Sequence, residues 1–135
     1  MREVWAEGPR SYLGLAVAGF PNLFTVTGPG SPSVLSNMMV SIEQHVEWIA
    51  DFLAAQQAAE FTVFEPELTA QDEWVTHVND VAAATLMPQA NSWYMGANIP
   101  GKPQIFMPYA GGVGIYRTLC AGIAERGYPG FVRSR

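Results

Sequence analysis

The sequence predicts an α/β fold in which short strands and Gly/Pro-rich turns alternate with helices. Residues 23–27 (LFTVT) are a β-branched and aromatic run between Pro21-Asn22 and the turn Gly28-Pro29-Gly30, which is typical of a buried strand. A helical periodicity of apolar residues begins near Met39. The predicted order is therefore strand, tight turn and helix.

The turn at residues 28–33 is the first candidate binding site. A strand that ends in a Gly-rich turn presents backbone N–H groups and a helix N-terminus at the carboxyl edge of a sheet, which favours electron-rich ligand atoms. Gly28 and Gly30 have no Cβ to hold a ligand away, and Pro29 and Pro32 stiffen the rim. The turn matches neither G-x-G-x-x-G nor the phosphate-binding loop, so a plain strand-to-helix connection explains it equally well.

Composition narrows the class of protein. A chain of 135 residues with 49% apolar and 14% charged residues fits one compact domain. The net charge of -5 and the absence of a Lys/Arg cluster argue against nucleic acid as a partner. Cys120 is the only cysteine, which excludes an internal disulfide and predicts a cytoplasmic protein. The apolar stretch 13–20 is too short to span a bilayer, so no membrane association is expected.

The helix that begins near Met39 carries an apolar stripe, which we expect to face the core. Its members follow one another at spacings of four, three and four residues, and two aromatic residues widen it: Ile42, Val46, Ile49 and Leu53, with Trp48 and Phe52.

The same helix carries an acidic row, Glu43, Glu47 and Asp51, which we interpret as a solvated face. His45 lies away from this row and is predicted to be a packing or hydrogen-bonding residue. No metal site is therefore expected.

Four further elements are expected after this helix. Residues 60–65 form a strand, and a capping box at Thr69–Asp72 opens a second helix that runs to about Leu86. Residues 104–109 form another strand, and a final helix ends at Gly127. The tail at residues 129–135 reads as an edge strand.

The long loop at residues 88–103 is the second candidate site, because loops of this length are usually functional or disordered and its aromatic residues argue against disorder. Trp93 offers a flat face and one N–H donor, which suits a sugar or an aromatic ring. Taken alone, a tryptophan that pins the loop to the core is the better interpretation.

Three stretches together resemble the C-terminal portion of FAD-dependent Baeyer-Villiger monooxygenases of the cyclohexanone and phenylacetone monooxygenase type. They are GFPNLFTVTGPGSPSVLSNMMVSIEQHVEWIAD (19–51), QANSWYMGANIPGKP (89–103), and YAGGVGIYR (109–117) with GYPGF (127–131). The resemblance implies a Rossmann-like flavoprotein with two dinucleotide-binding domains, of which this chain is one partial domain. Residues 1–59 would end the FAD-binding domain with one strand-turn-helix, and residues 60–135 would form a C-terminal helical segment with the aromatic loop.

Enzymes of this family bind FAD and NADPH, activate O2 on the reduced flavin, and insert one oxygen atom next to the carbonyl of a small ketone. The resemblance places Gly28, Pro29, Met38 and Trp93 at the cofactors, with Trp93 reaching the NADP ribose when its loop closes as a lid. It also implies a substrate-side loop made of Ser33, Val34, Leu35, Ser36, Asn37 and Met38.

Several family features have no counterpart in the sequence. These are the G-x-G-x-x-G fingerprint, the F-x-G-x-x-x-H signature, and an arginine and an aspartate that stabilise the reaction intermediates. No catalytic residue is therefore predicted here, and the expected partner is the missing N-terminal portion of the same enzyme. The alternatives are part of an N- or S-oxygenating flavin monooxygenase, or a small non-catalytic α+β binding module.

Overall fold

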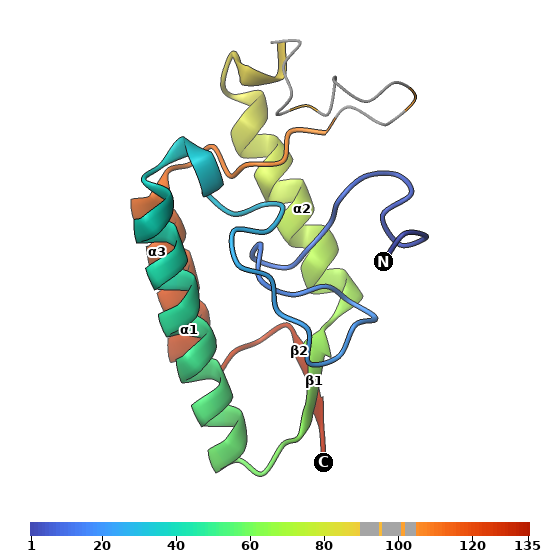
Figure 1. The fold of residues 1–135 in the computed structure, drawn as a ribbon, viewed down its shortest axis with the longest axis vertical. Helices are drawn as coiled ribbons and strands as arrows, with labels where there is room; N and C mark the ends of the chain where they lie inside the picture. Colours follow the sequence, from blue (N-terminus) through green and yellow to red (C-terminus); the bar gives the residue numbers. More distant parts are fainter. Residues whose placement is uncertain (90–94, 96–100, 102–104) are drawn as a thin grey trace.

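The computed structural model describes residues 1–89, 95, 101 and 105–135, with only the backbone at Val34 and Pro88. The described elements are η1 (Ser33–Leu35), α1 (Met38–Ala58), β1 (Val63–Pro66), α2 (Leu68–Ala83), η2 (Met87–Gln89), α3 (Val113–Glu125) and β2 (Phe131–Ser134). Figure 1 shows α1 and α3 side by side and α2 opposite them, with the N-terminal segment between. Within the described ranges, none of these helices is long and apolar enough to cross a membrane.

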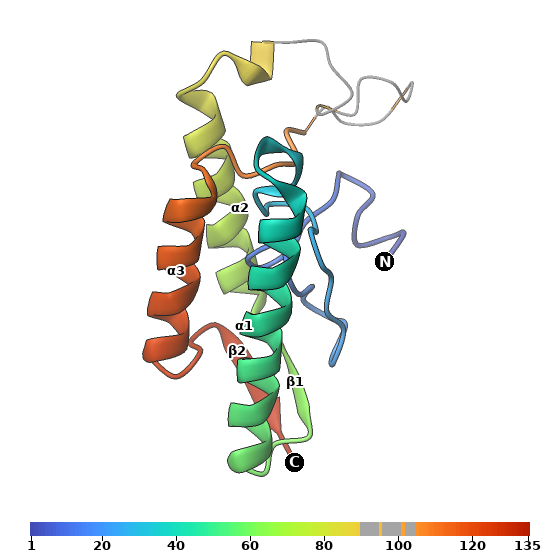
Figure 2. The same cartoon turned by 60° about the vertical axis from the view of Figure 1, so that its left-hand side comes forward.

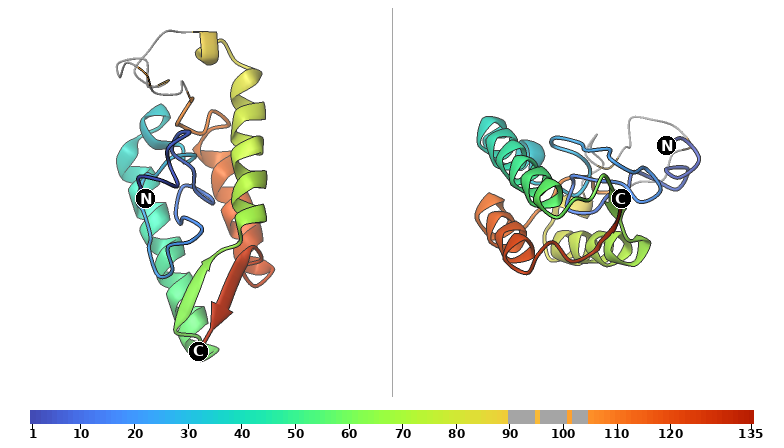
Figure 3. Two further views of the ribbon diagram at one scale, coloured as in Figure 1. Left: turned by 90° about the vertical axis from the view of Figure 1, so that its right-hand side faces the viewer. Right: turned by 90° about the horizontal axis from the view of Figure 1, so that it is seen from below.

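The two strands pair antiparallel, with Phe64 opposite Arg133 and Pro66 opposite Phe131. Both strands were predicted: β2 lies within the predicted range 129–135, and β1 begins three residues later and ends one residue later than the predicted range 60–65. The pairing joins the chain's C-terminal end to a segment near its middle, so the small sheet closes one end of the molecule (Figure 3).

An aromatic cluster centred on Phe52 holds α1 on the sheet. Phe52 is fully buried. Its ring centroid lies 5.1 Å from that of Phe64 on β1 and 4.6 Å from that of Phe131 on β2, and it stacks on Trp48 at 5.6 Å. Aromatic pairs at such distances stabilise a core beyond their buried area.

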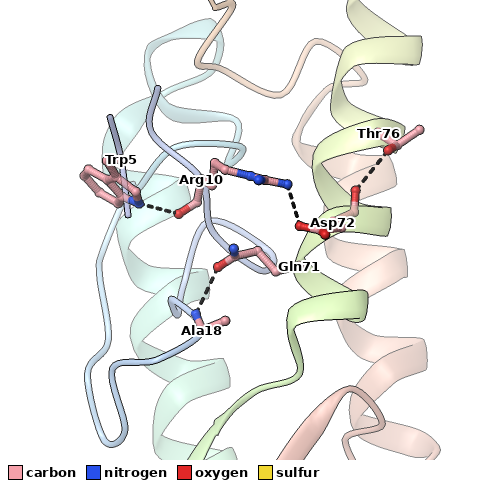
Figure 4. A network of polar contacts seen from close by, with 6 residues as sticks. All are labelled: Trp5, Arg10, Ala18, Gln71, Asp72 and Thr76. Atoms are coloured by element: carbon pink, nitrogen blue, oxygen red, sulfur yellow. Dashed lines mark hydrogen bonds and ion pairs between the residues drawn. The ribbon is translucent and has the colours of Figure 1, made fainter. Parts of the chain in front are cut away.

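The N-terminal segment is fastened to α2 by polar contacts (Figure 4). Arg10 forms an ion pair with Asp72, and the buried Gln71 side chain accepts a 2.9 Å hydrogen bond from the Ala18 N–H. Trp5 donates its indole N–H to the Arg10 carbonyl at 2.8 Å. Between these points Leu13, Leu15 and Val17 are fully buried.

The predicted strand at residues 23–27 is wrong. Only Phe24 makes a bridge, to Ala16, and Asn22 and Thr27 on either side adopt positive φ angles of 59° and 55°. Leu23 and Val26 are exposed rather than buried. A strand needs a continuous ladder of partners, and the nearby segment 12–16 turns back on itself. The strand-turn-helix unit is therefore a loop followed by a helix.

The predicted buried face of α1 is right only in part, since Trp48 and Phe52 are buried and Ile49 packs against the core. The residues that face the core are Ser41, Gln44, His45, Trp48, Phe52 and Gln56. The aromatic side chains of the wider stripe are inside, but Val46 and Leu53 are exposed. Since Trp48 and Phe52 carry the largest apolar surfaces, the helix is rotated to bury them first.

Three smaller expectations also fail. Helix α2 begins at Leu68 with no side-chain hydrogen bond at its N-cap residue Glu67, so the capping box at Thr69–Asp72 does not form. The helix ends at Ala83, and Leu86 beyond it is 79% exposed. Residues 105–109, the described part of the predicted strand 104–109, are irregular.

Candidate functional site

The predicted flavin-side turn at residues 28–32 is closed by its own hydrogen bonds. The Ser31 N–H and the Ser31 hydroxyl both donate to the Gly28 carbonyl, at 3.1 and 2.8 Å. Ser31 itself is fully buried. One serine therefore fixes the turn from both its main chain and its side chain.

Four residues that are distant in sequence hold this turn from outside. Trp74 of α2 donates its indole N–H to the Gly30 carbonyl at 3.2 Å, and Ser11 donates its hydroxyl to the Pro29 carbonyl at 2.5 Å. The Gly30 N–H donates to the Met107 carbonyl and the Tyr109 N–H donates to the Ser31 carbonyl, both at 2.7 Å. The turn is thus clamped between α2 and residues 107–109.

The two glycines of the turn face protein. A Cβ on Gly28 would lie 2.5 Å from both the Gly14 carbonyl oxygen and the Thr25 hydroxyl. Gly30 has a φ of +84°, and a Cβ there would lie 3.0 Å from the Trp74 indole nitrogen. Glycine at these two positions is therefore required by internal packing and backbone conformation.

The predicted substrate-side residues lie between this clamp and α1. Ser33 has a positive φ of 45° and begins η1, to which Val34 and Leu35 belong. The Ser36 hydroxyl hydrogen-bonds the Ser41 hydroxyl at 2.8 Å. Burial falls along this stretch, from half-buried residues to exposed ones: Ser33, Leu35 and Ser36 are half-buried, and Asn37 and Met38 are exposed.

Asn37 caps α1 by accepting a 3.0 Å hydrogen bond from the Met39 N–H on its side-chain oxygen. The helix therefore begins at Met38 on the molecular surface, with its first-turn N–H groups at an exposed end. Such an end carries a partial positive charge and favours electron-rich ligand atoms. Met38 is thus accessible to a ligand, whereas Gly28 and Pro29 are held within the turn.

His45 ties α1 to the start of the turn. Its Nδ1 accepts a 3.0 Å hydrogen bond from the Thr27 N–H, and its ring packs edge-on against Tyr116 of α3 with centroids 5.5 Å apart. The side chain is fully buried, and this burial lowers the pKa of His45 to about 4. The expectation of a packing or hydrogen-bonding histidine is therefore confirmed.

Met95 of the aromatic loop lies near the substrate-side residue Leu35. The Ile105 N–H donates to the Met95 carbonyl at 3.1 Å. Met95 and Phe106 form a small core cluster with Ala82, and Leu35 packs against this cluster. Trp93 lies outside the described residues, so Met95 is the residue of this loop that the structure places beside η1.

Three cavities flank α2. One of about 430 Å³ lies beside Met95 and is also lined by Arg10, Asn79 and Phe106. A larger one of about 720 Å³ lies between α2 and α3, beside Trp74, His77 and Arg126. A small one of about 20 Å³ lies beside Pro29 and Gly30 of the turn, and none of these three is lined by residues 33–38.

The remaining titratable groups of the core are neutral at ordinary pH. Burial raises the pKa of the Cys120 thiol to about 11 and that of Tyr12 to about 12. Within residues 1–89, 95, 101 and 105–135, no group of three or more His, Cys, Asp or Glu side chains could hold a metal ion. The described site therefore offers backbone groups and packing surfaces for a ligand.

The residues that clamp the turn are the part of the site that sequence reasoning misses. Trp74 lies within the predicted second helix, where nothing in its sequence context links it to the turn, yet its indole N–H fixes Gly30. Ser11, Met107 and Tyr109 carry no motif at all. Each contact joins residues at least 18 positions apart, so no local pattern predicts it.

The chain has close relatives among characterised monooxygenases, although no family model matches it. It is 43% identical over all 135 residues to a Baeyer-Villiger monooxygenase of Pseudooceanicola batsensis, and spans 24% of that protein. It is 40% identical over 131 residues, 96% of this chain, to an acetone monooxygenase (methyl acetate-forming) of a Gordonia species, spanning 25% of it. It is 39% identical over 128 residues, 95% of this chain, to a phenazine N-monooxygenase of Lysobacter antibioticus, spanning 23% of it.

Solved structures give the same result. A cyclohexanone monooxygenase from Rhodococcus sp. Phi1 bound to NADP+ matches 98% of this chain with a TM-score of 0.94 and 41% identity, over 25% of its own length. A structure of OTEMO in complex with FAD and NADP matches 99% of this chain with a TM-score of 0.90 and 31% identity, over 24% of its own length. The chain thus spans about a quarter of the length of the proteins it matches.

Proposed function

We propose that this chain is the C-terminal part of a Baeyer-Villiger monooxygenase, because it is homologous to about a quarter of the length of each such enzyme that it matches. The whole enzyme would use FAD and NADPH to insert one oxygen atom of O2 next to the carbonyl of a small ketone, giving an ester or lactone. We also propose that residues 1–59 of this chain form the end of an FAD-binding domain and that residues 60–135 form a C-terminal helical segment.

The observation that carries this proposal is the contact between η1 and Met95 of the aromatic loop, next to the clamped turn. Leu35 of η1 packs against the cluster of Met95 and Phe106, so the proposed substrate-side loop adjoins one residue of the proposed NADP-side loop. A ketone oxygenase of this kind needs the flavin, the ketone and the nicotinamide cofactor at one place. The contact of Leu35 with this cluster supports the proposal that these segments serve one site.

The described residues fit a flavin on one side only. The exposed N-terminus of α1 at Asn37 and Met38 can donate backbone N–H groups to electron-rich atoms of the ring. The turn at Gly28 and Pro29 is held rigidly behind it and supplies the wall of the site. When bound, FAD supplies the electron transfer and O2 chemistry that these groups lack.

The role of this chain in the reaction is therefore orientation and exclusion of water. The hydrogen bonds on Gly30 and Ser31 fix the wall, and the capped end of α1 fixes the direction of its N–H groups. Trp93, by its match to the family motif, is proposed to contact the NADP ribose when its loop closes. The pyrophosphate of FAD would be held by the other three quarters of the enzyme.

The test is a chimera in which this chain replaces the homologous residues of the 43% identical relative. The purified chimera should contain one FAD per chain by visible absorbance and oxidise NADPH in the presence of a small ketone, with the ester identified by mass spectrometry. The isolated chain, reconstituted with FAD in parallel, should stay colourless. A colourless chimera, or a yellow isolated chain, would contradict the proposal.

A second candidate is N-oxygenation, which the 39% identity to a phenazine N-monooxygenase favours. The same chimera distinguishes the two, since a nitrogen heterocycle rather than a ketone would then stimulate NADPH oxidation and gain one oxygen atom. The relatives named above weigh against a non-catalytic module.

A further inference from the structure

Helix α1 has a second apolar face, which is largely exposed and reaches the described core only through Ile49. The outer stripe, as we name it, consists of Met39, Ile42, Val46, Ile49 and Leu53, spaced three, four, three and four residues apart. At 100° per residue this spacing places all five on one side of the helix over about 21 Å. Met39, Val46 and Leu53 are 62%, 52% and 42% exposed, and Ile42 and Ile49 are half-buried.

The inner face of α1, which carries His45, Trp48 and Phe52, is already packed against the rest of this chain. Trp48 donates its indole N–H to the Cys120 carbonyl of α3 at 2.9 Å, Phe52 packs on the sheet, and His45 holds Thr27. Figure 2 shows α3 on one side of α1 and the N-terminal segment on the other. A rotation of the helix that buried the outer stripe would therefore expose Trp48 and Phe52.

At 100° per residue the outer stripe lies about 100–120° around the helix from the face of Trp48 and Phe52, so α1 is apolar over two adjacent faces. A helix that is apolar over more than one face is typical of a larger protein in which both faces are packed. Leu23 and Val26 are also exposed, and they belong to the loop that His45 and Phe52 hold against α1.

Resting on the proposed function, we propose that the outer stripe of α1 docks on an apolar surface of the remaining three quarters of the enzyme. The relatives are about four times as long as this chain, which leaves most of their fold available to cover this face. The stripe would then fix α1, and with it the exposed N-terminus at Met38, relative to the cofactor-binding portion.

Two observations favour this occupant over a second copy of the chain. The stripe offers five side chains, whereas a stable interface between separate proteins uses about 20–30 residues on each side. The acidic row Glu43, Glu47 and Asp51 runs along the same helix beside the stripe, and all three residues are exposed. In an antiparallel two-fold pairing of α1 helices the two acidic rows would lie on the same side and repel.

Thiol labelling tests the proposal in two contexts. Val46→Cys is placed in the stripe, and Ala54→Cys, also an exposed position, lies 80° around the helix beside Glu47 as the matched control. In the isolated chain both new thiols should react with a maleimide at similar rates, because Cys120 is buried and both positions are exposed. In the chimera the thiol of Val46→Cys should react at least tenfold more slowly, and that of Ala54→Cys at an unchanged rate.

Equal, fast labelling of both positions in the chimera would overturn the proposal. So would a dimer of the isolated chain that Val46→Lys dissociates, since the occupant would then be a second copy. If the chimera is insoluble, the tagged chain is co-expressed with the other three quarters of the relative. Val46→Lys should then abolish co-purification while Ala54→Lys leaves it intact, and a failure of the unmodified pair to co-purify counts against the proposal.

These outcomes are separable from the test of the proposed function. A chimera that protects position 46 and binds no flavin supports the docking surface and refutes the flavoenzyme. A chimera that oxidises ketones with position 46 fully reactive does the reverse.

Discussion

Acid should destabilise this protein through His45. The folded state holds this side chain neutral, because it is fully buried and its Nδ1 accepts the Thr27 N–H at 3.0 Å. Protonation would place a second N–H where an acceptor is needed. Burial accordingly lowers the pKa of His45 from its ordinary value of 6.5 to about 4.

The sign and size of the effect follow from linkage. Between pH 6.5 and 4 the unfolded chain binds a proton at this histidine and the folded chain does not, so stability falls as the pH falls. For pKa values of 6.5 and about 4, the loss is about 2 kcal/mol on going from pH 7.5 to 5, and about 3 kcal/mol by pH 4. Tyr116 and Cys120, which face this region from α3, have raised pKa values and stay neutral over this range.

The measurement is urea unfolding followed by tryptophan fluorescence at pH 7.5, 6, 5 and 4.5. His45→Asn keeps a side-chain oxygen that can accept the Thr27 N–H but cannot titrate, so this variant should lose most of the stability difference between pH 7.5 and 5. It should also be less stable at pH 7.5 by about 1–3 kcal/mol, because the ring leaves a cavity beside Tyr116. His77→Asn is the matched control and should keep the wild-type pH dependence. Equal pH dependence in wild type and His45→Asn would refute the reasoning.

Three further outcomes are expected. Gly30→Ala should lower the free energy of unfolding by about 1–2 kcal/mol because of its positive φ and the Trp74 contact, whereas Gly114→Ala, with open space at its Cβ, should leave it unchanged or raise it by up to about 1 kcal/mol in the same urea assay. The Cys120 thiol should resist a disulfide reagent in the folded chain and react fully in urea, since it is buried with a pKa near 11; fast reaction without denaturant would contradict this. In the full-length chimera, Trp93→Ala should raise the KM for NADPH and leave the FAD content unchanged, and loss of FAD would contradict the proposed role.

The sequence predicts the helices of this fold better than their orientation. Helix α1 begins at Met38, one residue from the predicted start, and α3 ends just before Gly127 as its C-terminal signal indicates. The buried side of α1 is predicted only in part because the helix is apolar on two sides and periodicity alone does not rank them. The side of α1 that is buried is the one that carries Trp48 and Phe52. These two residues pack on aromatic residues that are distant in sequence, namely Tyr128, Phe64 and Phe131.

The failed strand at residues 23–27 has a different cause. Its composition favours a strand, but a strand also needs a neighbouring strand to which its backbone N–H and C=O groups can bond. Here the backbone groups of this segment form isolated hydrogen bonds to other parts of the chain. The Thr25 N–H donates to the Leu15 carbonyl, and Asn22 binds Phe64 through both its main chain and its side chain. The composition of a segment indicates its strand propensity, but it does not show whether another strand lies beside it.

Only part of the candidate site could be predicted from the sequence. The Gly/Pro turn and the start of α1 are visible as local patterns, whereas the clamp on the turn is built from Ser11, Trp74, Met107 and Tyr109, which no pattern links to it. The sequence of the turn therefore does not distinguish a plain strand-to-helix connection from a ligand site. The distinction depends on the residues that hold the turn and on those beside the exposed start of α1.

That fastening determines which parts of the site move together. The bonds Gly30 N–Met107 O and Tyr109 N–Ser31 O join the turn to the segment that follows the aromatic loop, and Trp74 joins the same turn to α2. Three such hydrogen bonds contribute about 1 kcal/mol each, so the turn, α2 and residues 107–109 form one rigid unit. The bond between Ile105 N and Met95 O lies outside this unit. Loss of the bond between Ile105 and Met95 would therefore leave every hydrogen bond of the proposed flavin-side wall intact, which is the arrangement that an enzyme needs if it exchanges one cofactor while holding the other in place.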